Sequence, residues 1–597
     1  MLTVGEAAAV LGVSISTLRN WDRQGKLSPV RHPINDYRLY PTVMIQSLRA
    51  AISGHSAGAA GNLSQSSSRQ RVEANFDVSF VTPMAFAEKQ IQQAYRPYIQ
   101  VHKWFARRPG TLFRALLLSE FGDGPLTDTF LQTNDLSGRT IFDPFMGGGT
   151  PAVEANRLGI DVVACDINPM AEWIVRQELG FVDLNEFANA ADEVARRVDA
   201  AVGANYRTRC VHCGGDAEVK YFIWVKTVTC ESCGHPVQLF PGYLVAGNAR
   251  HPNHVLVCPC CHDLFELPDL PERGTQVSCT KCGGTFVNEP VAQRNSYTCG
   301  ACGHKGRYPS AGTPDAPPNH SMIAIEYHCT RCKPNHQGRF FKAPDPHDIE
   351  TYGHVSAALE LSDHKGVIPS EAIPAGDETA RLHRWGYRRY RDMFNDRQLL
   401  GLSTLASTIG EVENATVRRA LATVFSDFLR YQNMLCRYDT YALKCQDIFS
   451  VHGFPVGLVQ CENNLLGIPN VGSGGFRHFV QKYLDAKKYC DKPFEVVGTG
   501  SAKRRIDIAG ERIAAEFVDT LPGRGKRRQA WLICSPSDEV NVPSGSIDAV
   551  MTDPPYFDNL QYAELMDFCY VWLRRLAAAD SPHFINPSTR SAEELTG

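Results

Sequence analysis

Six pairs of cysteines in the spacing Cys-x-x-Cys lie close together in the middle of this chain, and they hold twelve of its 20 cysteines. Several pairs are followed by glycine, as in Cys-Thr-Lys-Cys-Gly, a turn in which backbone N–H groups face metal-bound sulfurs. In a reducing compartment disulfides are rare, and such pairs bind metal ions. We therefore predict about three closed, structural zinc sites, each with four cysteine ligands. The predicted ligands are Cys210, Cys213, Cys230, Cys233, Cys258, Cys261, Cys279, Cys282, Cys299, Cys302, Cys329 and Cys332.

The intervals between successive pairs suit zinc ribbons, in which two neighbouring pairs share one ion. The sequence therefore favours sequential pairing, with the first and second pairs on one ion, the third and fourth on another, and the last two on a third. Crossed pairings remain open, and an iron–sulfur cluster is the alternative to zinc.

Composition places the chain among ordinary globular proteins. Its length suits about three to five domains, and 43% hydrophobic with 21% charged residues excludes a wholly disordered or fibrous chain. The 61 Lys and Arg against 64 Asp and Glu give a net charge of −3, which excludes a nucleic-acid binder driven by bulk positive charge. The chain has no run of about 18 apolar residues and no secretory signal, so we expect a cytoplasmic protein without membrane contact.

The first 50 residues predict a compact unit of their own. In GEAAAVLGVSISTLRNWDRQGKL, apolar residues at helical spacing stand on both sides of a Gly-Val-Ser turn, as in a helix-turn-helix. The second helix carries polar groups suited to DNA bases and phosphates, namely Ser16, Thr17, Arg19 and Asn20. Residues 38–40 read as part of a wing. The unit resembles the N-terminal DNA-binding unit of the MerR and excisionase families; a small protein-docking module is the alternative.

A glycine-rich turn follows a short apolar strand at residues 140–142. Asp-Pro-Phe-Met-Gly-Gly-Gly-Thr occupies 143–150, a helix follows, and a second strand at 161–165 ends at Asp166. Glycines let a backbone approach a ligand closely, and a carboxylate at the end of the second strand can accept hydrogen bonds from ribose hydroxyls. No Gly-Lys-Ser/Thr follows, which disfavours a nucleoside-triphosphate loop. The βαβ unit predicts binding of an adenosine-containing cofactor, and a purely structural turn is the alternative.

A second motif, Asp553-Pro554-Pro555-Tyr556, ends another apolar strand. The two prolines lack backbone donors and fix the turn, which leaves carbonyl oxygens directed outward. Asp553 and the Pro554 carbonyl are suited to accept the two N–H bonds of an exocyclic amine, and Tyr556 can stack on a base. A proline turn without chemistry is the alternative interpretation of this motif alone.

As an ordered set, VHKWFARRP, DPFMGGGTPAVEA, DINPMA and DPPYFDNLQYAEL resemble the amino-group DNA methyltransferases, over about residues 76–590. The nearest resemblance is to a family of adenine-specific DNA methylases with an N-terminal domain of unknown function. It implies an α/β fold: a Rossmann-like S-adenosylmethionine-dependent methyltransferase sheet with a zinc-ribbon insertion, preceded here by the winged helix-turn-helix. The resemblance makes Asp553, Pro554, Pro555 and Tyr556 catalytic. It gives as cofactor-binding residues Asp143, Pro144, Phe145, Gly147, Gly149, Thr150, Asp166 and Asn168, with residues 101–109 covering the cofactor.

The expected activity is therefore methyl transfer from S-adenosylmethionine to adenine N6 in double-stranded DNA. Asp rather than Ser before Pro-Pro-Tyr favours adenine N6 over cytosine N4. The family resemblance suggests a restriction or phage-defence role. The alternatives are an RNA or tRNA amino-methyltransferase and a non-catalytic DNA-binding regulatory subunit with a methylase fold.

The sequence also predicts that the methyltransferase sheet is incomplete. Only 597 − 556 = 41 residues follow Tyr556, too few for the remaining strands of a methyltransferase. A partner polypeptide, a longer chain, or strands permuted into 346–520 are the three explanations. The zinc insertion is expected to read or clamp DNA, with a purely scaffolding role as the alternative. Two basic stretches, 381–391 and 524–528, suit DNA contact, and a solvated charged face is the alternative for each. The predicted domains are 1–50 (helix-turn-helix), 51–72 (flexible linker), 73–204 (first methyltransferase part with the cofactor motifs), 205–345 (zinc-ribbon insertion), 346–520 (mixed helical region, DNA recognition) and 521–597 (second methyltransferase part with the catalytic motif).

Overall fold

The computed structural model divides the chain into two compact units, Met1–Arg69 and Gln70–Gly597. It describes residues 2–11, 13, 17–18, 21, 27, 30–31, 38–42, 44–45, 72–309, 314–498, 502–523, 525, 527–555 and 560–594. The predicted linker therefore lies outside the described residues, apart from Val72. Each unit is described by itself below.

The N-terminal unit combines a helix with a small antiparallel sheet. The helix is α1 (Val4–Leu11). The sheet has three strands in the order β1-β3-β2, which are β1 (Leu2–Thr3), β3 (Arg38–Tyr40) and β2 (Val30–Arg31). Strand β3 coincides with residues 38–40, which were predicted to be part of the wing, and it pairs with β2. The hydrophobic core of the N-terminal unit consists of Ala7, Ala8, Leu11, Leu18, Leu27, Tyr40 and Ile45. Ser16, Arg19 and Asn20, predicted to contact DNA, lie outside the described residues.

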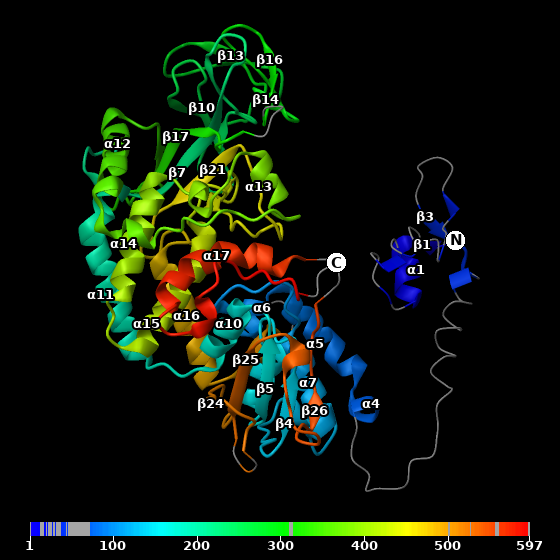
Figure 1. Cartoon of the computed structure of the whole chain (residues 1–597). Coiled ribbons are helices and arrows are strands. Elements are labelled where there is room, and N and C mark those ends of the chain that lie inside the picture. Colours follow the sequence, from blue (N-terminus) through cyan, green and yellow to red (C-terminus); the bar gives the residue numbers. More distant parts are fainter. Residues whose placement is uncertain are drawn as a thin grey trace. The chain divides into compact units, whose positions relative to one another are not determined.

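The large unit is built on a parallel five-stranded sheet in the order β24-β25-β5-β4-β26 (Figure 1). Its central strand β5 is a buried run of β-branched and small residues, as expected where helices cover both faces of a sheet. Helix α9 (Thr150–Arg157) connects β4 to β5. The strands are β4 (Thr140–Asp143), β5 (Asp161–Asp166), β24 (Glu516–Phe517), β25 (Gln529–Cys534) and β26 (Ala549–Val550).

One edge of this sheet is formed by β26, which pairs only with β4 within the described part of the chain. Val550 on this strand is 60% exposed. From the predicted region 346–520, only β24 joins the sheet, at the opposite edge. The described residues of 346–520 therefore supply one strand of the sheet and none beside β26.

Helices from the first part of the unit pack on the sheet and lead into the helical region. Asp77 caps α5 by accepting a hydrogen bond from Phe80 N, and Asp183 caps α11 in the same way. The elements are α4 (Val72–Asn75), α5 (Val78–Gln90), α6 (Gln92–Tyr95), the 3-10 helix η2 (Pro97–Gln100), α7 (Gly110–Phe121), α8 (Leu126–Thr129), α10 (Pro169–Leu179), α11 (Leu184–Val202) and η3 (Gly203–Tyr206).

A fully buried ionic cluster ties α7 and α9 to residues far along the chain. Arg114 Nη1 lies 2.9 Å from Glu511 Oε2, and Arg157 Nη1 lies 2.7 Å from Glu495 Oε1. Buried charges of this kind are stable only when paired. The cluster therefore holds the 495–511 segment against the helices that flank the sheet.

A second, antiparallel sheet carries the cysteine-rich region. Its two long strands β7 (Asp216–Thr229) and β17 (Asn319–His328) pair with each other, in the order β18-β17-β7-β21. The remaining strands of this sheet are β6 (Arg207–Arg209), β8 (Pro236–Gln238), β18 (Arg339–Lys342) and β21 (Val459–Asn463). Short strands between β8 and β17 are β9 (Leu244–Ala246), β10 (His254–Val257), β11 (Leu264–Leu267), β12 (Gln276–Ser278), β13 (Thr285–Val287), β14 (Ala292–Gln293), β15 (Ser296–Thr298) and β16 (Lys305–Arg307).

The predicted helical region forms most of the remaining core, together with the helix that follows the Asp-Pro-Pro-Tyr motif. That helix is α17 (Tyr562–Ala577), which buries Phe568 and Trp572. The helices of the region are α12 (Pro346–Leu361), α13 (Ala380–Arg384), α14 (Asp396–Gly410), α15 (Ala415–Phe428) and α16 (Phe476–Asp491). Of these, α15 packs against α17. The 3-10 helices are η4 (His336–Gly338), η5 (Asp363–Val367), η6 (Tyr390–Met393), η7 (Leu429–Tyr431), η9 (Ser537–Glu539) and η10 (Pro582–Phe584). Small strand pairs are β19 (Tyr438–Asp439) with β20 (Lys444–Cys445) and β22 (Phe494–Val497) with β23 (Arg504–Asp507).

The basic stretch 381–391 is not the base-stacking surface that its alternation of cations and rings predicts. Trp385, Tyr387 and Tyr390 are buried in the core, so their faces are not available to a base. Of the second basic stretch, Arg528 is buried, and residues 524 and 526 lie outside the described residues. Among the described residues, no helix combines the length and apolar surface that crossing a membrane requires.

Candidate functional site

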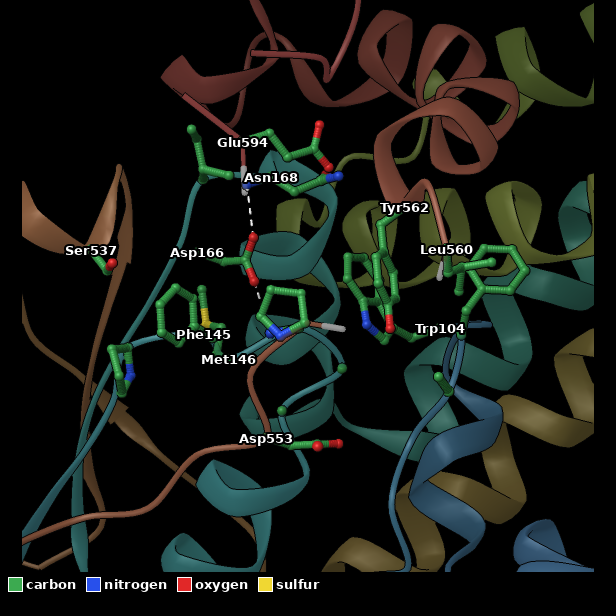
Figure 2. Close-up of a pocket in the computed structure, with 18 of the residues that line it drawn as sticks. Trp104, Phe145, Met146, Asp166, Asn168, Ser537, Asp553, Leu560, Tyr562 and Glu594 are labelled. Carbon is green, nitrogen blue, oxygen red and sulfur yellow. Dashed lines mark hydrogen bonds between the residues drawn. The ribbon is translucent and has the colours of Figure 1, made fainter. Parts of the chain in front are cut away.

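A cavity of about 570 Å³ lies where the carboxyl ends of β4, β5 and β25 meet (Figure 2). This end of a parallel sheet is where ligands bind in α/β folds. The cavity is lined by Trp104, Phe105, Ala106, Arg107, Pro144, Phe145, Met146, Gly147, Gly148, Gly149, Thr150, Pro151, Asp166, Ile167, Asn168, Pro536, Ser537, Asp538, Glu539, Asp553, Pro555, Leu560, Gln561, Tyr562, Glu593 and Glu594. Segments separated by some 400 residues therefore share one wall, as the sequence motifs predict.

The glycine turn fits closely between β4 and the segment at 104–107. Gly147 has φ +45° and Gly149 has φ +76°, conformations that side chains disfavour. A Cβ on Gly147 would lie 2.9 Å from Trp104 Nε1, and one on Gly148 would lie 2.8 Å from Arg107 Cζ. The turn therefore requires glycine both for its backbone conformation and for the space around it.

The acid at the end of β5 is held by backbone donors. Gly147 N donates to Asp166 Oδ2 at 2.9 Å, and Asn168 N donates to Asp166 Oδ1 at 2.9 Å. Burial raises the pKa of Asp166 to about 6. Glu594 lies near Asn168 in Figure 2, and burial raises its pKa to about 7, with a further contribution from the charge of Asp166. Both residues line the cavity, where their carboxyl oxygens can accept hydrogen bonds from a polar ligand.

Most of the residues predicted to bind the cofactor line the cavity, but Asp143 does not. Its side chain is fully buried below the turn and accepts a hydrogen bond from Phe145 N at 3.2 Å. Burial raises the pKa of Asp143 to about 7. Pro144, Phe145, Gly147, Gly149, Thr150, Asp166 and Asn168 all line the cavity. Asp143 is thus placed to shape the turn rather than to touch a ligand.

Asp553 and Pro555 reach the same cavity. Asp553 lies below Asp166 in the view of Figure 2, and its Oδ1 lies 3.3 Å from Arg108 Nε. Burial raises the pKa of Asp553, while the guanidinium of Arg108 lowers it. Pro554 is exposed and does not line the cavity, and Tyr556 lies outside the described residues.

Two aromatic side chains that lie within the quoted motifs, but were not predicted as site residues, complete the wall. Trp104 stacks on Tyr562, with ring centroids 5.6 Å apart and planes at 19°. Arg107 anchors the segment beside them, because its Nη2 donates to Glu178 Oε1 at 2.7 Å and its Nη1 donates to Gly148 O. The sequence placed 101–109 over the cofactor, but it gave no signal for the contact between Trp104 and Tyr562.

The twelve predicted metal ligands form three groups of four. Within each group, the four Sγ atoms all lie within 4.8 Å of one another. Four sulfurs 2.3 Å from a tetrahedral zinc ion are about 3.8 Å apart, and the Sγ–Sγ distances between pairs are 3.7 to 3.9 Å. The groups are compatible with three structural zinc sites, and they are Cys210, Cys213, Cys329 and Cys332; Cys230, Cys233, Cys299 and Cys302; and Cys258, Cys261, Cys279 and Cys282.

The sequential pairing expected from the spacing is wrong for two of the three groups. The groups are nested, with the first pair beside the sixth, the second beside the fifth, and the third beside the fourth. The reason is the antiparallel pairing of β7 with β17. The residues before β7 therefore lie next to those after β17, and the residues after β7 lie next to those before β17.

Zinc content gives a direct test of this nesting. Replacing Cys210 and Cys213 with serine is expected to lower the zinc content from three ions to two. Replacing Cys329 and Cys332 in the same variant is expected to leave the content at two, because the two pairs share a single ion. Combining the first change with serine at Cys230 and Cys233 is expected to leave one ion. Elemental analysis of the purified variants measures these values. Sequential pairing predicts the opposite result: one ion when Cys329 and Cys332 are replaced together with Cys210 and Cys213, and two ions when Cys230 and Cys233 are replaced with them.

Residues 3–40 match the family model described as MerR family regulatory protein. No curated protein and no solved structure matches the chain. The N-terminal unit is thus similar to the DNA-binding helix-turn-helix of MerR regulators, which indicates DNA as a ligand.

Proposed function

We propose that this chain is an S-adenosylmethionine-dependent methyltransferase that acts on adenine N6 in DNA, with a Rossmann-like methyltransferase sheet. One observation carries the proposal: the glycine turn, Asp166 and Asp553 line a single cavity at the carboxyl ends of parallel strands. The DNA-binding similarity of the N-terminal unit supports DNA as the substrate.

The residues of the cavity fit such a cofactor. A volume of about 570 Å³ is within the range of small-molecule sites. Asp166 offers carboxylate oxygens to ribose hydroxyls, and Gly147 and Gly148 let the turn pack tightly against Trp104 and Arg107. S-adenosylmethionine supplies a methyl group on a positively charged sulfur. The residues that would hold it are Phe145, Gly147, Gly148, Thr150, Asp166, Asn168, Ser537 and Asp538.

The role of the Asp-Pro-Pro-Tyr segment is to hold the target amine. The carboxylate of Asp553 and the carbonyl of Pro554 accept its two N–H bonds, which weakens the conjugation of the nitrogen lone pair with the ring. The base reaches this position only outside the duplex, at a cost of a few kcal/mol. Arg108, which contacts Asp553, must share or release the carboxylate when the amine binds.

The second candidate is a non-catalytic DNA-binding regulatory subunit, which the unpaired edge of β26 favours among the described strands. For an active enzyme, the same edge favours a partner polypeptide or a further chain segment that completes the sheet. A restriction or phage-defence role, and DNA contact by the zinc-bearing insertion, follow from the resemblance. An RNA or tRNA amino-methyltransferase is a weaker alternative, because the N-terminal unit resembles a DNA-binding module.

The test is methyl transfer from labelled S-adenosylmethionine to unmodified DNA duplex, with structured RNA as the comparison substrate. We expect label on adenine N6 of DNA, identified after digestion to nucleosides. Label on RNA alone selects the RNA enzyme. Cofactor binding without transfer to either substrate rules out an enzyme that is active alone and leaves the regulatory subunit or an enzyme that requires the partner polypeptide.

A further inference from the structure

A second cavity, of about 480 Å³, shares Trp104 and Arg107 with the cofactor cavity. Its lining includes Lys89, Lys103, Trp104, Arg107, Arg430 and Lys482, together with the uncharged residues 90–94 and Ile99. Five of these are cationic, and none of the described lining residues is an Asp or a Glu. Such a concentration of one charge attracts anions.

Three of the cations have carboxylate partners outside the lining. Arg107 pairs with Glu178 at 2.7 Å. Arg430 Nε and Lys482 Nζ lie 2.8 Å and 3.7 Å from the carboxylate of Asp427. These three charges are therefore largely compensated within the protein.

Lys89 and Lys103 differ from the other three. Among the described residues, neither ammonium group has a carboxylate within 4.0 Å: Lys89 Nζ donates to the carbonyl of Arg107 at 3.4 Å, and Lys103 Nζ lies 5.6 Å from the ring centre of Phe105. Burial, together with the charge of Arg430, lowers the pKa of Lys103, while the carboxylates of Asp447 and Asp427 raise it. A poorly solvated cation without a directly paired carboxylate is costly, and a bound anion would relieve that cost. Lys89 is exposed and adds a second positive charge.

The cavity is also placed beside the acid assigned to the target amine. The charge of Lys89 lowers the pKa of Asp553, so the two groups lie within electrostatic reach. Trp104, which stacks on Tyr562 at the cofactor cavity, forms part of both linings. An anion held at Lys89 and Lys103 would therefore be a near neighbour of the target base.

We propose that this cavity binds the sugar-phosphate backbone of the nucleic-acid strand that carries the target base, with Lys89 and Lys103 as phosphate contacts. The identity of the strand rests on the proposed function. A volume of about 480 Å³ exceeds what one phosphate group needs and suits a nucleotide of a chain. Backbone contacts of this kind position a strand without reading its sequence.

The test is the salt dependence of binding to a fluorescein-labelled DNA duplex, using the full chain. Each lost phosphate contact reduces the slope of log K against log salt by about 0.9, or about 0.7 on a single strand. We expect that loss for Lys103→Gln, about twice that loss for the double variant with Lys89→Gln, and none for Lys103→Arg, which keeps the charge. Lys488→Gln on the exposed face of α16 is the control.

An unchanged slope in the double variant overturns the inference, even if the wild-type chain methylates DNA. A reduced slope supports it, even if no methyl transfer is found, so the two proposals fail separately. Adenosine monophosphate separates the possible sources of the phosphate. If it binds the wild type and not Lys103→Gln while the DNA slope stays the same, the site takes a free nucleotide and the strand assignment is wrong.

Discussion

Replacing Asp553 with alanine is expected to lower the rate of methyl transfer by about 10²–10³-fold, or about 2.7–4 kcal/mol, the usual effect of removing one hydrogen-bonding group at a reacting centre. The reason is that the carboxylate is proposed to accept a hydrogen bond from the target amine, an interaction that strengthens as the lone pair becomes available. Its ion pair with Arg108 is partly exposed, so its loss is expected to cost little stability. Initial rates with labelled cofactor at saturating DNA measure the change.

The controls separate chemistry from folding. Cofactor affinity, measured by calorimetry, is expected to stay within about twofold of the wild type. Asp553→Asn keeps one acceptor oxygen and is expected to fall between alanine and wild type. Asp519→Asn removes an exposed carboxylate away from the cavity and is expected to have no effect. Full transfer by Asp553→Ala would falsify the assignment of this residue to the amine.

Replacing Gly147 with alanine is expected to weaken S-adenosylmethionine binding by at least about tenfold, or 1.4 kcal/mol. The new Cβ would lie 2.9 Å from Trp104 Nε1, so the wall of the cavity must move. The turn would also strain, since φ is +45°, and the hydrogen bond from Gly147 N to Asp166 would shift with it. Calorimetric titration of the cofactor gives the affinity.

Gly138 provides a matched control for the backbone effect. Its φ is +80°, and a Cβ there would meet no atom within 4 Å. Gly138→Ala should therefore show the cost of a left-handed alanine alone, about 1–2 kcal/mol of stability, with normal cofactor affinity. Equal losses of affinity in both variants would contradict a role of the Gly147 turn in binding.

The parts of the site that a local motif encodes could be predicted from the sequence. The glycine turn and the segment ending at Asp553 converge because parallel strands bring their carboxyl ends to one edge. Asp166 was found for the same reason. Asp143 is the exception within the motif, because whether a residue at a strand end faces a ligand or the core depends on packing that the sequence does not display.

Features that depend on long-range packing were missed. The stack of Trp104 on Tyr562 joins residues more than 450 positions apart, and no periodicity links them. The cation-lined cavity draws Lys89, Lys103 and Lys482 from three separate segments, and the one motif among them, at 101–109, gave no sign of this grouping. In contrast, the rings of 381–391 looked like a binding surface because composition cannot distinguish a buried aromatic residue from an exposed one.

The twelve predicted metal ligands do form three groups of four cysteines, but the sequence predicted the wrong grouping for two of them. A Cys-x-x-Cys spacing fixes the geometry of one pair and carries no information about the pair across the ion. That information resides in the register between β7 and β17, which brings Val219 opposite Tyr327 and Thr227 opposite Asn319.

Nesting also sets an order of assembly for the cysteine-rich region. The innermost, middle and outermost groups join sulfurs 24, 72 and 122 residues apart. In an unstructured chain the outermost closure costs about 1.4 kcal/mol more in entropy than the innermost, and that difference shrinks once the inner loops are already tied. Sequential ribbons could each close as they left the ribosome. Here the first pair, Cys210 and Cys213, must wait for Cys332 to be synthesised, so its thiols stay open to oxidation longest.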